Sequence, residues 1–400
     1  MSRTMKRSTS PVFAGLLLAL ALSSFPSAGF ASLREDCYKL NVAGHDGWQL
    51  KAIRADGNYV VAEDEKNHLF LLDSATLKTV LPLGSISGGC AASIGPDGSR
   101  IAIGEGQGRI RILDGKTGKP IVPDVTDKHG VSSLDFSQDG RRIVVMTDAH
   151  VAVLDASTGK AVAPPIIDAP SDWGSDFSSA QLSPDNRLIL TTNKLSMRPA
   201  RLWDVQTAKQ VRVLDSGLRS VRNPNAITDQ AFATVFSPDG STIATAEELS
   251  DEKGWKNVAR IWDTKSGAVL FTSAEMVRWV TAVAFSRDGR LLAVGACGVT
   301  VFDIRRKIAV TREMGIDIIH YSLHVGFSPD GRRVFTTGRT LYASIFDVAT
   351  QKELFDFSYS DDTSAAGFNS DGTRFITNAT NSDYSPVGIY AWDVSKSPAK

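Results

Sequence analysis

The chain has 400 residues, of which 44 are basic, 44 are acidic and 42% are hydrophobic. A domain of this size has ample core. The balanced charge argues against nucleic acid or an anionic membrane surface as the partner.

The first 31 residues have the layout of a secretory signal. Three basic residues precede an apolar run over 12–22, and small residues follow up to Ala31. The run is too short to span a bilayer comfortably. We therefore expect cleavage before Ser32, release into a periplasm or medium, and no membrane insertion afterwards. An uncleaved anchor is the alternative. Without the leader, 41 basic residues face 44 acidic ones, so the mature chain is mildly acidic.

One unit then recurs eight times, and its clearest copy runs from Ala231 to Phe271. Four short runs of β-branched, aromatic and small residues are separated by tight turns such as Pro238-Asp239-Gly240, the pattern of an antiparallel four-stranded meander. The runs are apolar or small on both faces, so each sheet must lie between copies of itself. Two sequence features each recur once per copy and agree on eight copies. One is an Asp in a turn, at positions 56, 97, 139, 185, 239, 288, 330 and 371. The other is an apolar residue followed by Asp, with the Asp at positions 73, 114, 155, 204, 263, 303, 347 and 393.

The Trp-Asp pairs at 203, 262 and 392 and the Phe-Ser-Pro-Asp-Gly runs at 236 and 327 resemble WD40 repeats. The resemblance covers nearly everything after residue 40 and implies an all-β, single β-propeller of four-stranded antiparallel blades. The two sequence features predict eight blades, and seven is the alternative. WD40 repeats often carry an Asp in the turn before the third strand. In this chain, Asp148 alone is at the corresponding position of a repeat. We therefore expect a degenerate, exported bacterial member of the family.

The ends of the chain predict how the ring closes. The last repeat stops after Val394 without a fourth strand, while residues 37–42 alternate like a strand ahead of the first repeat. We expect this N-terminal strand to be the outer strand of the last blade, where it covers an exposed edge. The length leaves no room for a second domain, so one monomeric propeller is expected over residues 32–400.

Three cysteines, Cys37, Cys90 and Cys297, are expected to be buried thiols. The last two belong to the second and sixth repeats, which lie opposite each other in a ring of eight, so a bond between them would cross the channel. A disulfide is the alternative.

Turns of antiparallel meanders alternate between the two ends of the strands. The first-to-second and third-to-fourth turns therefore share one face, here called the short-turn face. The other connections share the loop-rich face, which carries the insertions 168–177, 216–229, 247–257, 313–321 and 378–387. Because loops carry function, we expect a partner protein to bind the loop-rich face. The predicted anchors are aromatic and Arg side chains: Trp173, Trp255, Trp279, Arg222, Arg278, Tyr321, Tyr342 and Tyr384. The alternative is that several of them plug the channel mouth or pack their own loops.

No catalytic constellation is present, and neither a cofactor nor a metal is predicted. The run 104–108 is a glycine-rich strand-to-strand turn with no helix behind it, which is not a phosphate loop. His129 and His150 fall in loops of one repeat, a weak hint of a metal site. The Asp-x-x-Thr-Gly-Lys segments at 114 and 155 look like parts of the blade-locking motif of quinoprotein dehydrogenases, without its Trp. The sequence predicts a non-catalytic, exported interaction scaffold. The alternative is a periplasmic enzyme or small-molecule binder, quinoprotein-like or lactonase-like, with its site at the channel mouth.

Overall fold

The computed structural model describes residues 42–46, 49–53, 58–87, 90–167, 177–193, 199–215, 229–251, 254–276, 280–315, 322–338, 343–357, 362–380 and 386–396. The chain divides into Met1–Lys39 and Leu40–Lys400, and the described residues belong to the second unit. Their regular structure is all β. None of them forms a helix that would be long and apolar enough to cross a membrane. The predicted leader lies outside the described residues.

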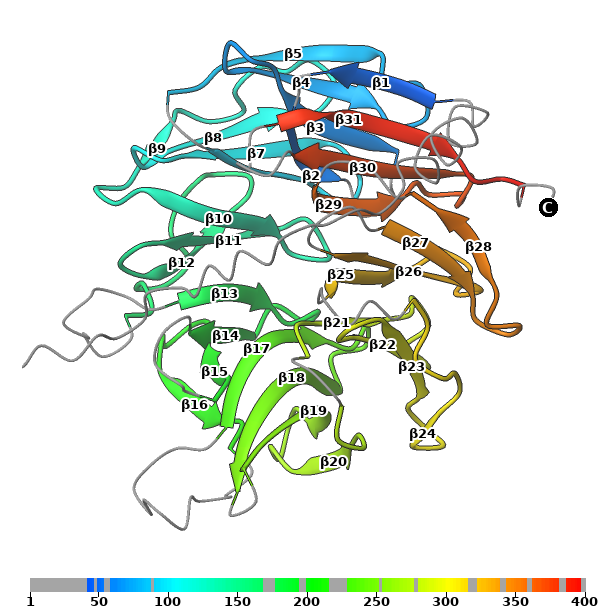
Figure 1. The fold of residues 1–400 in the computed structure, drawn as a ribbon. Helices are drawn as coiled ribbons and strands as arrows, with labels where there is room; N and C mark the ends of the chain where they lie inside the picture. The colour runs from blue at the N-terminus through cyan, green and yellow to red at the C-terminus, as the bar shows by residue number, and fades with distance from the viewer. Residues whose placement is uncertain are drawn as a thin grey trace, which may run out of the picture. The chain divides into compact units, whose positions relative to one another are not determined.

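The strands form eight antiparallel sheets that follow one another along the chain (Figure 1). The first four sheets consist of β2 (Gln49–Ile53), β3 (Tyr59–Glu63), β4 (His68–Asp73) and β5 (Thr79–Ser85); β6 (Cys90–Ile94), β7 (Arg100–Glu105), β8 (Arg109–Asp114) and β9 (Val125–Thr126); β10 (Val131–Phe136), β11 (Arg142–Thr147) and β12 (Val151–Asp155); and β13 (Phe177–Leu182), β14 (Leu188–Asn193), β15 (Arg201–Asp204) and β16 (Gln210–Val213). In the third sheet, Ala161 and Ile166 bridge to β12 in place of a fourth strand.

The other four sheets repeat the same meander. They consist of β17 (Asp229–Phe236), β18 (Thr242–Asp251), β19 (Gly254–Asp263) and β20 (Val269–Thr272); β21 (Ala282–Phe285), β22 (Leu291–Gly295), β23 (Val299–Asp303) and β24 (Ile308–Ala309); β25 (Ser322–Phe327), β26 (Arg333–Gly338), β27 (Ala343–Asp347) and β28 (Glu353–Asp356); and β29 (Asp362–Phe368), β30 (Arg374–Thr380), β31 (Pro386–Asp393) and β1 (Val42–Asp46).

The sheets are the eight blades of a closed β-propeller. The first strand of each blade contacts the blade that precedes it, and β2 of the first blade contacts β30 and β31 of the last. The first strands therefore line the centre of the ring, and the fourth strands lie at its rim. The predicted fold and the count of eight are both confirmed.

The prediction that an N-terminal strand closes the last blade is confirmed, but the strand ends at Asp46 and not at residue 42 as predicted. Strand β1 pairs antiparallel with β31, from Val42 opposite Trp392 to Asp46 opposite Gly388, and Figure 1 shows blue β1 beside red β31. The sequence placed this strand at 37–42, because Gly44 and Asp46 have low strand propensity. Pairing with the open edge of β31 overrides that preference. Residues 37–41 lie outside the described part of the chain.

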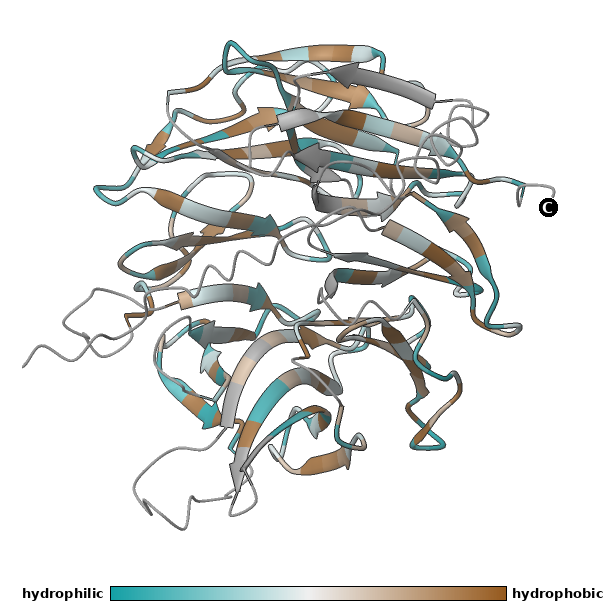
Figure 2. Cartoon of the chain, in the orientation of Figure 1, coloured by the Kyte–Doolittle hydropathy of each residue, from teal (hydrophilic) through white to brown (hydrophobic). Residues whose placement is uncertain are grey.

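The second strands form the core of every blade, because both of their faces are covered. Five of the six residues of β7, β11, β14 and β26 are buried, and Figure 2 shows hydrophobic segments along the strands with hydrophilic ones at many turns. Neighbouring blades share hydrophobic clusters. Ile112 of β8 in the second blade packs with Val145 of β11 in the third blade. Each such side chain contributes about 1.5–3 kcal/mol on burial.

The short turns have the expected chemistry. In the fifth blade, Gly240 has φ 71°, while Asp239 Oδ1 accepts hydrogen bonds from Ser237 Oγ at 2.6 Å and Ser241 N at 3.0 Å. Asn186, which follows the turn Asp at position 185 where most copies have Gly, also has a left-handed φ of 60°.

Cys297 is buried and outside any disulfide, as predicted, in the turn between β22 and β23. Cys90 begins β6, where the sequence placed it just ahead of that strand. Cys37 lies outside the described residues.

Candidate functional site

The fifth blade carries the longest second and third strands of the propeller among its described residues. Strands β18 and β19 each have 10 residues, whereas the second strands of the other blades have 5 to 7. Their pairing runs from Thr242 opposite Asp263 to Asp251 opposite Gly254. The sequence predicted a polar loop over 247–257; the polar residues instead extend the hairpin. As a second-to-third connection, the hairpin tip lies at the loop-rich face.

Of the eight predicted anchors, Trp255 lies on this hairpin, with its backbone opposite Ser250 near the tip. The predicted site therefore stays a prediction. The other seven anchors lie outside the described residues: Trp173, Trp279, Arg222, Arg278, Tyr321, Tyr342 and Tyr384.

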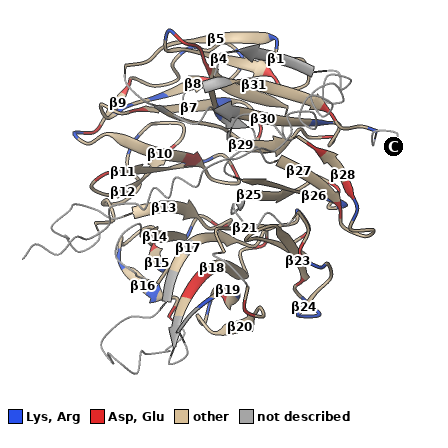
Figure 3. Ribbon diagram, viewed as in Figure 1, with Lys and Arg blue, Asp and Glu red and all other residues tan. Residues whose placement is uncertain are grey.

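A buried polar chain anchors the base of the hairpin. Trp262 Nε1 donates to Thr245 Oγ1 at 2.8 Å, and the Thr245 hydroxyl donates to Glu247. Glu247 Oε2 in turn lies 3.0 Å from Arg260 Nη1, and both side chains are at most 5% exposed. Figure 3 shows an acidic segment on β18 and a basic segment on the neighbouring strand β19. Removing one partner of such a buried pair leaves the other charge buried without compensation. The pair therefore holds β18 and β19 together at the base of the hairpin only while both residues are present.

The opposite, short-turn face uses its carboxylates within its own turns. Asp155 Oδ1 accepts hydrogen bonds from Ser157 Oγ at 2.6 Å and Thr158 N at 3.1 Å. Above all the Ser157 hydroxyl, and then the turn amides, lower the pKa of Asp155 to about 2. The same arrangement lowers the pKa of Asp114, Asp204, Asp263 and Asp347. These groups are accounted for by turn structure.

Two cavities lie at the centre of the ring, where the first strands reach the short-turn face. One, of about 450 Å³, is lined by residues that include Asp135, Gln181 and Arg287; the other, of about 480 Å³, is lined mainly by apolar residues and also contains Arg287. Although the Asp135 side chain reaches solvent, the surrounding strands desolvate its carboxyl and raise its pKa, while a 2.7 Å bond from Ser93 Oγ opposes the shift. Asp135 and Arg287 are the charged groups among the described lining residues.

A histidine and aspartate cluster lies at the loop-rich face, between the second and third blades. The rings of His129 and His150 are 5.8 Å apart and nearly perpendicular, at 83°. His150 Nε2 lies 3.1 Å from Asp127 Oδ2, and His129 Nδ1 lies 3.5 Å from Asp148 Oδ1. The sequence indicated the two histidines and missed the role of both aspartates. The signal was present, because each histidine ends an Asp-x-His triplet, at 127–129 and at 148–150.

The comparisons with known proteins agree with the fold. No family model matches the chain. An uncharacterized WD repeat-containing protein of Synechocystis sp. is 34% identical over 88 residues, which are 22% of this chain and 23% of that protein's length. The chain is a β-propeller, and its repeats resemble WD40 repeats. Its fold is similar to the crystal structure of the computationally designed Ika8 protein, with a TM-score of 0.64 and 15% identity over 88% of this chain and 98% of that one. At that identity the second likeness concerns the fold alone.

In this propeller, three tryptophans bond to a threonine of the neighbouring strand. The Nε1 to Oγ1 distances are 2.9 Å for Trp203 to Thr191, 2.8 Å for Trp262 to Thr245 and 2.9 Å for Trp392 to Thr377. Asp148, which the resemblance suggested for this network, is directed to His129 instead.

Proposed function

We propose that the protein is an exported interaction scaffold that binds a partner protein on its loop-rich face. The observation that carries this proposal is the β18–β19 hairpin, whose strands have 10 residues each, whereas the second strands of the other blades have 5 to 7. A rigid, projecting hairpin with Trp255 near its tip offers an anchor that loses little conformational entropy on binding.

The contrast between the two faces supports the same choice. On the short-turn face, carboxylates such as Asp155 and Asp239 are engaged by the hydroxyls and amides of their own turns. Those bonds explain why the residues are there without a ligand. On the loop-rich face, the β18–β19 hairpin continues beyond the strand length that the other blades use, which favours a role in recognition.

An enzyme or small-molecule binder would concentrate titratable groups where the first strands open on the channel. The described walls of the two central cavities carry Asp135 and Arg287 as charged groups, with Phe285 and Phe327 beside them. This composition gives the channel-mouth alternative less support than the scaffold.

Site-specific photo-crosslinking in intact cells tests the proposal. A crosslinking amino acid at position 255 is expected to capture one discrete partner, and the same amino acid at the exposed short-turn position Lys160 is expected to capture none. Capture from position 160 with no capture from position 255 would place the interaction on the wrong face for this proposal.

Export is tested separately. Mass spectrometry of the protein from the periplasmic or secreted fraction is expected to find Ser32 as the first residue. A protein that still carries residues 1–31, or that stays in the cytoplasmic fraction, rules out this part of the proposal without affecting the crosslinking result.

A further inference from the structure

We propose that Asp127, His129 and His150, with Asp148 as a fourth ligand, form a binding site for a divalent transition-metal ion, with Zn²⁺ as the best fit. One ligand atom from each of the first three residues lies within 4.8 Å of the others. The site does not depend on the proposed partner binding.

Two adjacent connections build the site. Asp127 and His129 lie between β9 and β10, and Asp148 and His150 lie between β11 and β12. These are a fourth-to-first and a second-to-third connection, so all four side chains reach the loop-rich face. The connection with Asp148 and His150 starts from the buried strand β11, and the connection with Asp127 and His129 leads into buried Val131 of β10, so the propeller fixes how the two triplets face each other.

The backbone beneath Asp127 is held closely by a glycine-rich turn. Asp127 N donates to Gly108 O at 2.8 Å, and a Cβ on Gly108 would lie 2.1 Å from Asp127 O. A Cβ on Gly130 would likewise lie 2.4 Å from Gly106 O. The glycines of 104–108, which the sequence identified as a strand turn, therefore allow the 127–130 loop to approach.

Asp127 itself is oriented before any ion binds. Its Oδ1 accepts a 2.8 Å hydrogen bond from His129 N, which turns Oδ2 towards His150 Nε2 at 3.1 Å. The Asp127 side chain is 25% exposed and that of His150 is 13% exposed. An ion bound here would be partly shielded and still accessible.

Thr147 orients the imidazole of His150. The Thr147 hydroxyl donates to His150 O at 3.1 Å and also lies 3.3 Å from His150 Nδ1. The hydroxyl oxygen also accepts hydrogen bonds from Ala149 N at 3.2 Å and His150 N at 3.0 Å. These contacts hold the imidazole so that Nε2 faces Asp127 Oδ2 at 3.1 Å. A cation bound there would contact both atoms, and the contact with Thr147 is the outer-shell support that metal-binding histidines usually have.

The donor set selects the class of ion. Two imidazoles with carboxylates suit Zn²⁺ and related transition metals, whereas Ca²⁺ and Mg²⁺ prefer oxygen ligands alone. Tetrahedral zinc with bonds of about 2.0–2.2 Å holds its ligand atoms about 3.3–3.5 Å apart. The two His–Asp pairs, at 3.1 and 3.5 Å, are already near that spacing. His129 and Asp148, with side chains 31% and 75% exposed, are free to rotate over the remaining distance.

Isothermal titration of the untagged, chelator-treated protein with Zn²⁺ alone at pH 7.5 tests the site. We expect saturable binding of one ion per chain. His129→Ala and His150→Ala should each weaken binding more than about 100-fold, and Thr147→Val about tenfold through loss of orientation.

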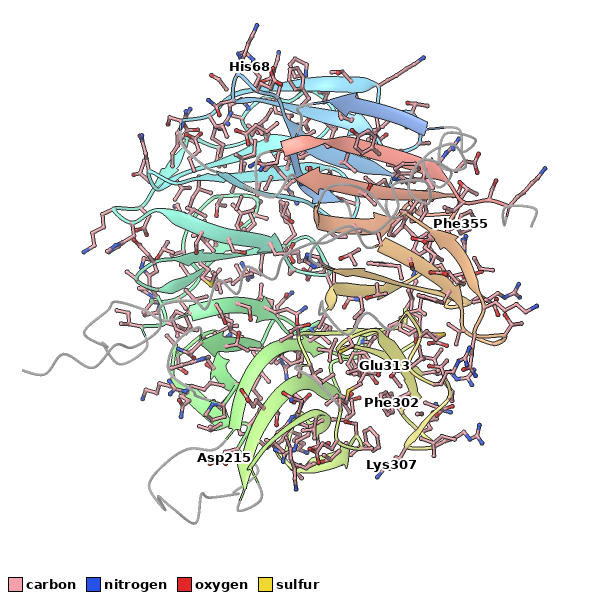
Figure 4. All side chains as sticks on the ribbon, in the orientation of Figure 1. His68, Asp215, Phe302, Lys307, Glu313 and Phe355 are labelled. Carbon is pink, nitrogen blue, oxygen red and sulfur yellow. The ribbon has the colours of Figure 1, made fainter. Side chains whose placement is uncertain are left out.

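His68→Ala is the matched control. His68 Nδ1 also lies beside an aspartate, 3.0 Å from Asp64 Oδ2, but it belongs to the first blade, at the edge seen in Figure 4, and not to the cluster. This variant should bind Zn²⁺ as the parent does. Melting temperatures without zinc identify any variant that fails to fold; Asp127→Asn, expected to weaken binding to a similar degree, then replaces His150→Ala.

Two results overturn the proposal. One is the absence of saturable binding up to about 1 mM Zn²⁺, a dissociation constant equivalent to about −4 kcal/mol; the His–Asp contacts are then structural only. The other is binding that His129→Ala, His150→Ala and Asp127→Asn leave unchanged, because the ion then binds elsewhere.

Discussion

The indole Nε1 of Trp262 donates a 2.8 Å hydrogen bond to Thr245 Oγ1, joining β19 to β18 at the base of the projecting hairpin. The tryptophan is fully buried and so is the threonine. The same bond recurs in the fourth and eighth blades. In the fifth blade this bond is extended to Glu247 and Arg260.

A double-mutant cycle should measure this bond. Thr245→Val leaves the buried indole N–H without an acceptor, and Trp262→Phe removes the donor, so each should cost about 1–3 kcal/mol of unfolding free energy. We expect a coupling energy of about 1 kcal/mol between the two substitutions in urea unfolding. Fully additive effects would show that the bond contributes nothing.

Arg111 ties the first two blades together and is buried with its acidic partner. Its Nε lies 3.3 Å from Glu105 Oε1, with side chains 8% and 1% exposed, and its Nη1 donates to Leu83 O at 2.9 Å. Arg111→Met removes the buried cationic partner of Glu105 and should lower the free energy of unfolding by about 3 kcal/mol.

Arg109→Met is the control for that substitution. Arg109 also approaches Glu105, at 3.7 Å, but its side chain is 47% exposed, so its removal should cost less than about 1 kcal/mol. Urea unfolding of both variants measures the difference. Equal losses, large or small, would contradict the assignment of the buried pair to Arg111.

The turn aspartates predict acid sensitivity. Hydrogen bonding depresses the pKa of Asp155 from 3.8 to about 2 in the folded protein. Its stabilising contribution is therefore present above pH 3.8 and is lost as the pH falls towards 2. Asp155→Asn, which also loses the 2.7 Å pair with Arg142, should be less stable than the parent at pH 7. The difference in urea midpoint should shrink between pH 4 and pH 2. A difference that stays constant over this range would mean that the charge of Asp155 plays no part.

Closure by β1 predicts the effect of truncation. A chain that begins at Leu40 keeps the five register pairs between Val42–Asp46 and β31, whereas one that begins at Gly47 loses all of them and exposes a strand edge. The shorter chain should lose several of the roughly 5–15 kcal/mol that stabilise a domain. Thermal unfolding of the two chains measures this; the same melting temperature for both would show that the ring closes without β1.

Most of the fold was predictable because it repeats. An Asp-Gly turn and an apolar-Asp pair are local signals, and eight copies of each correct the errors of any single one. The bounds of β1 were not predictable, since a strand beginning at Val42 through Gly44 and Asp46 forms only because β31 offers an unpaired edge.

The site was harder to predict because it depends on contacts between distant segments. The residues of 247–257 look like a polar loop, but buried pairing of Glu247 with Arg260 carries the hairpin past the usual strand length. Likewise Asp127 and His150 lie 23 positions apart in the sequence, and only the packing of adjacent blades brings their side chains within 3.1 Å. Local periodicity does not encode either contact.

The most direct test of the account is the affinity of the crosslinked partner, once purified, for two single variants. Truncating an aromatic anchor typically costs about 2 kcal/mol or more, so Trp255→Ala should weaken binding about thirtyfold. Lys160→Ala, on the exposed short-turn face, should bind as the parent does, and both variants should keep the parent's melting temperature. If Lys160→Ala abolishes binding while Trp255→Ala leaves it intact, the partner does not bind the loop-rich face and the account is wrong.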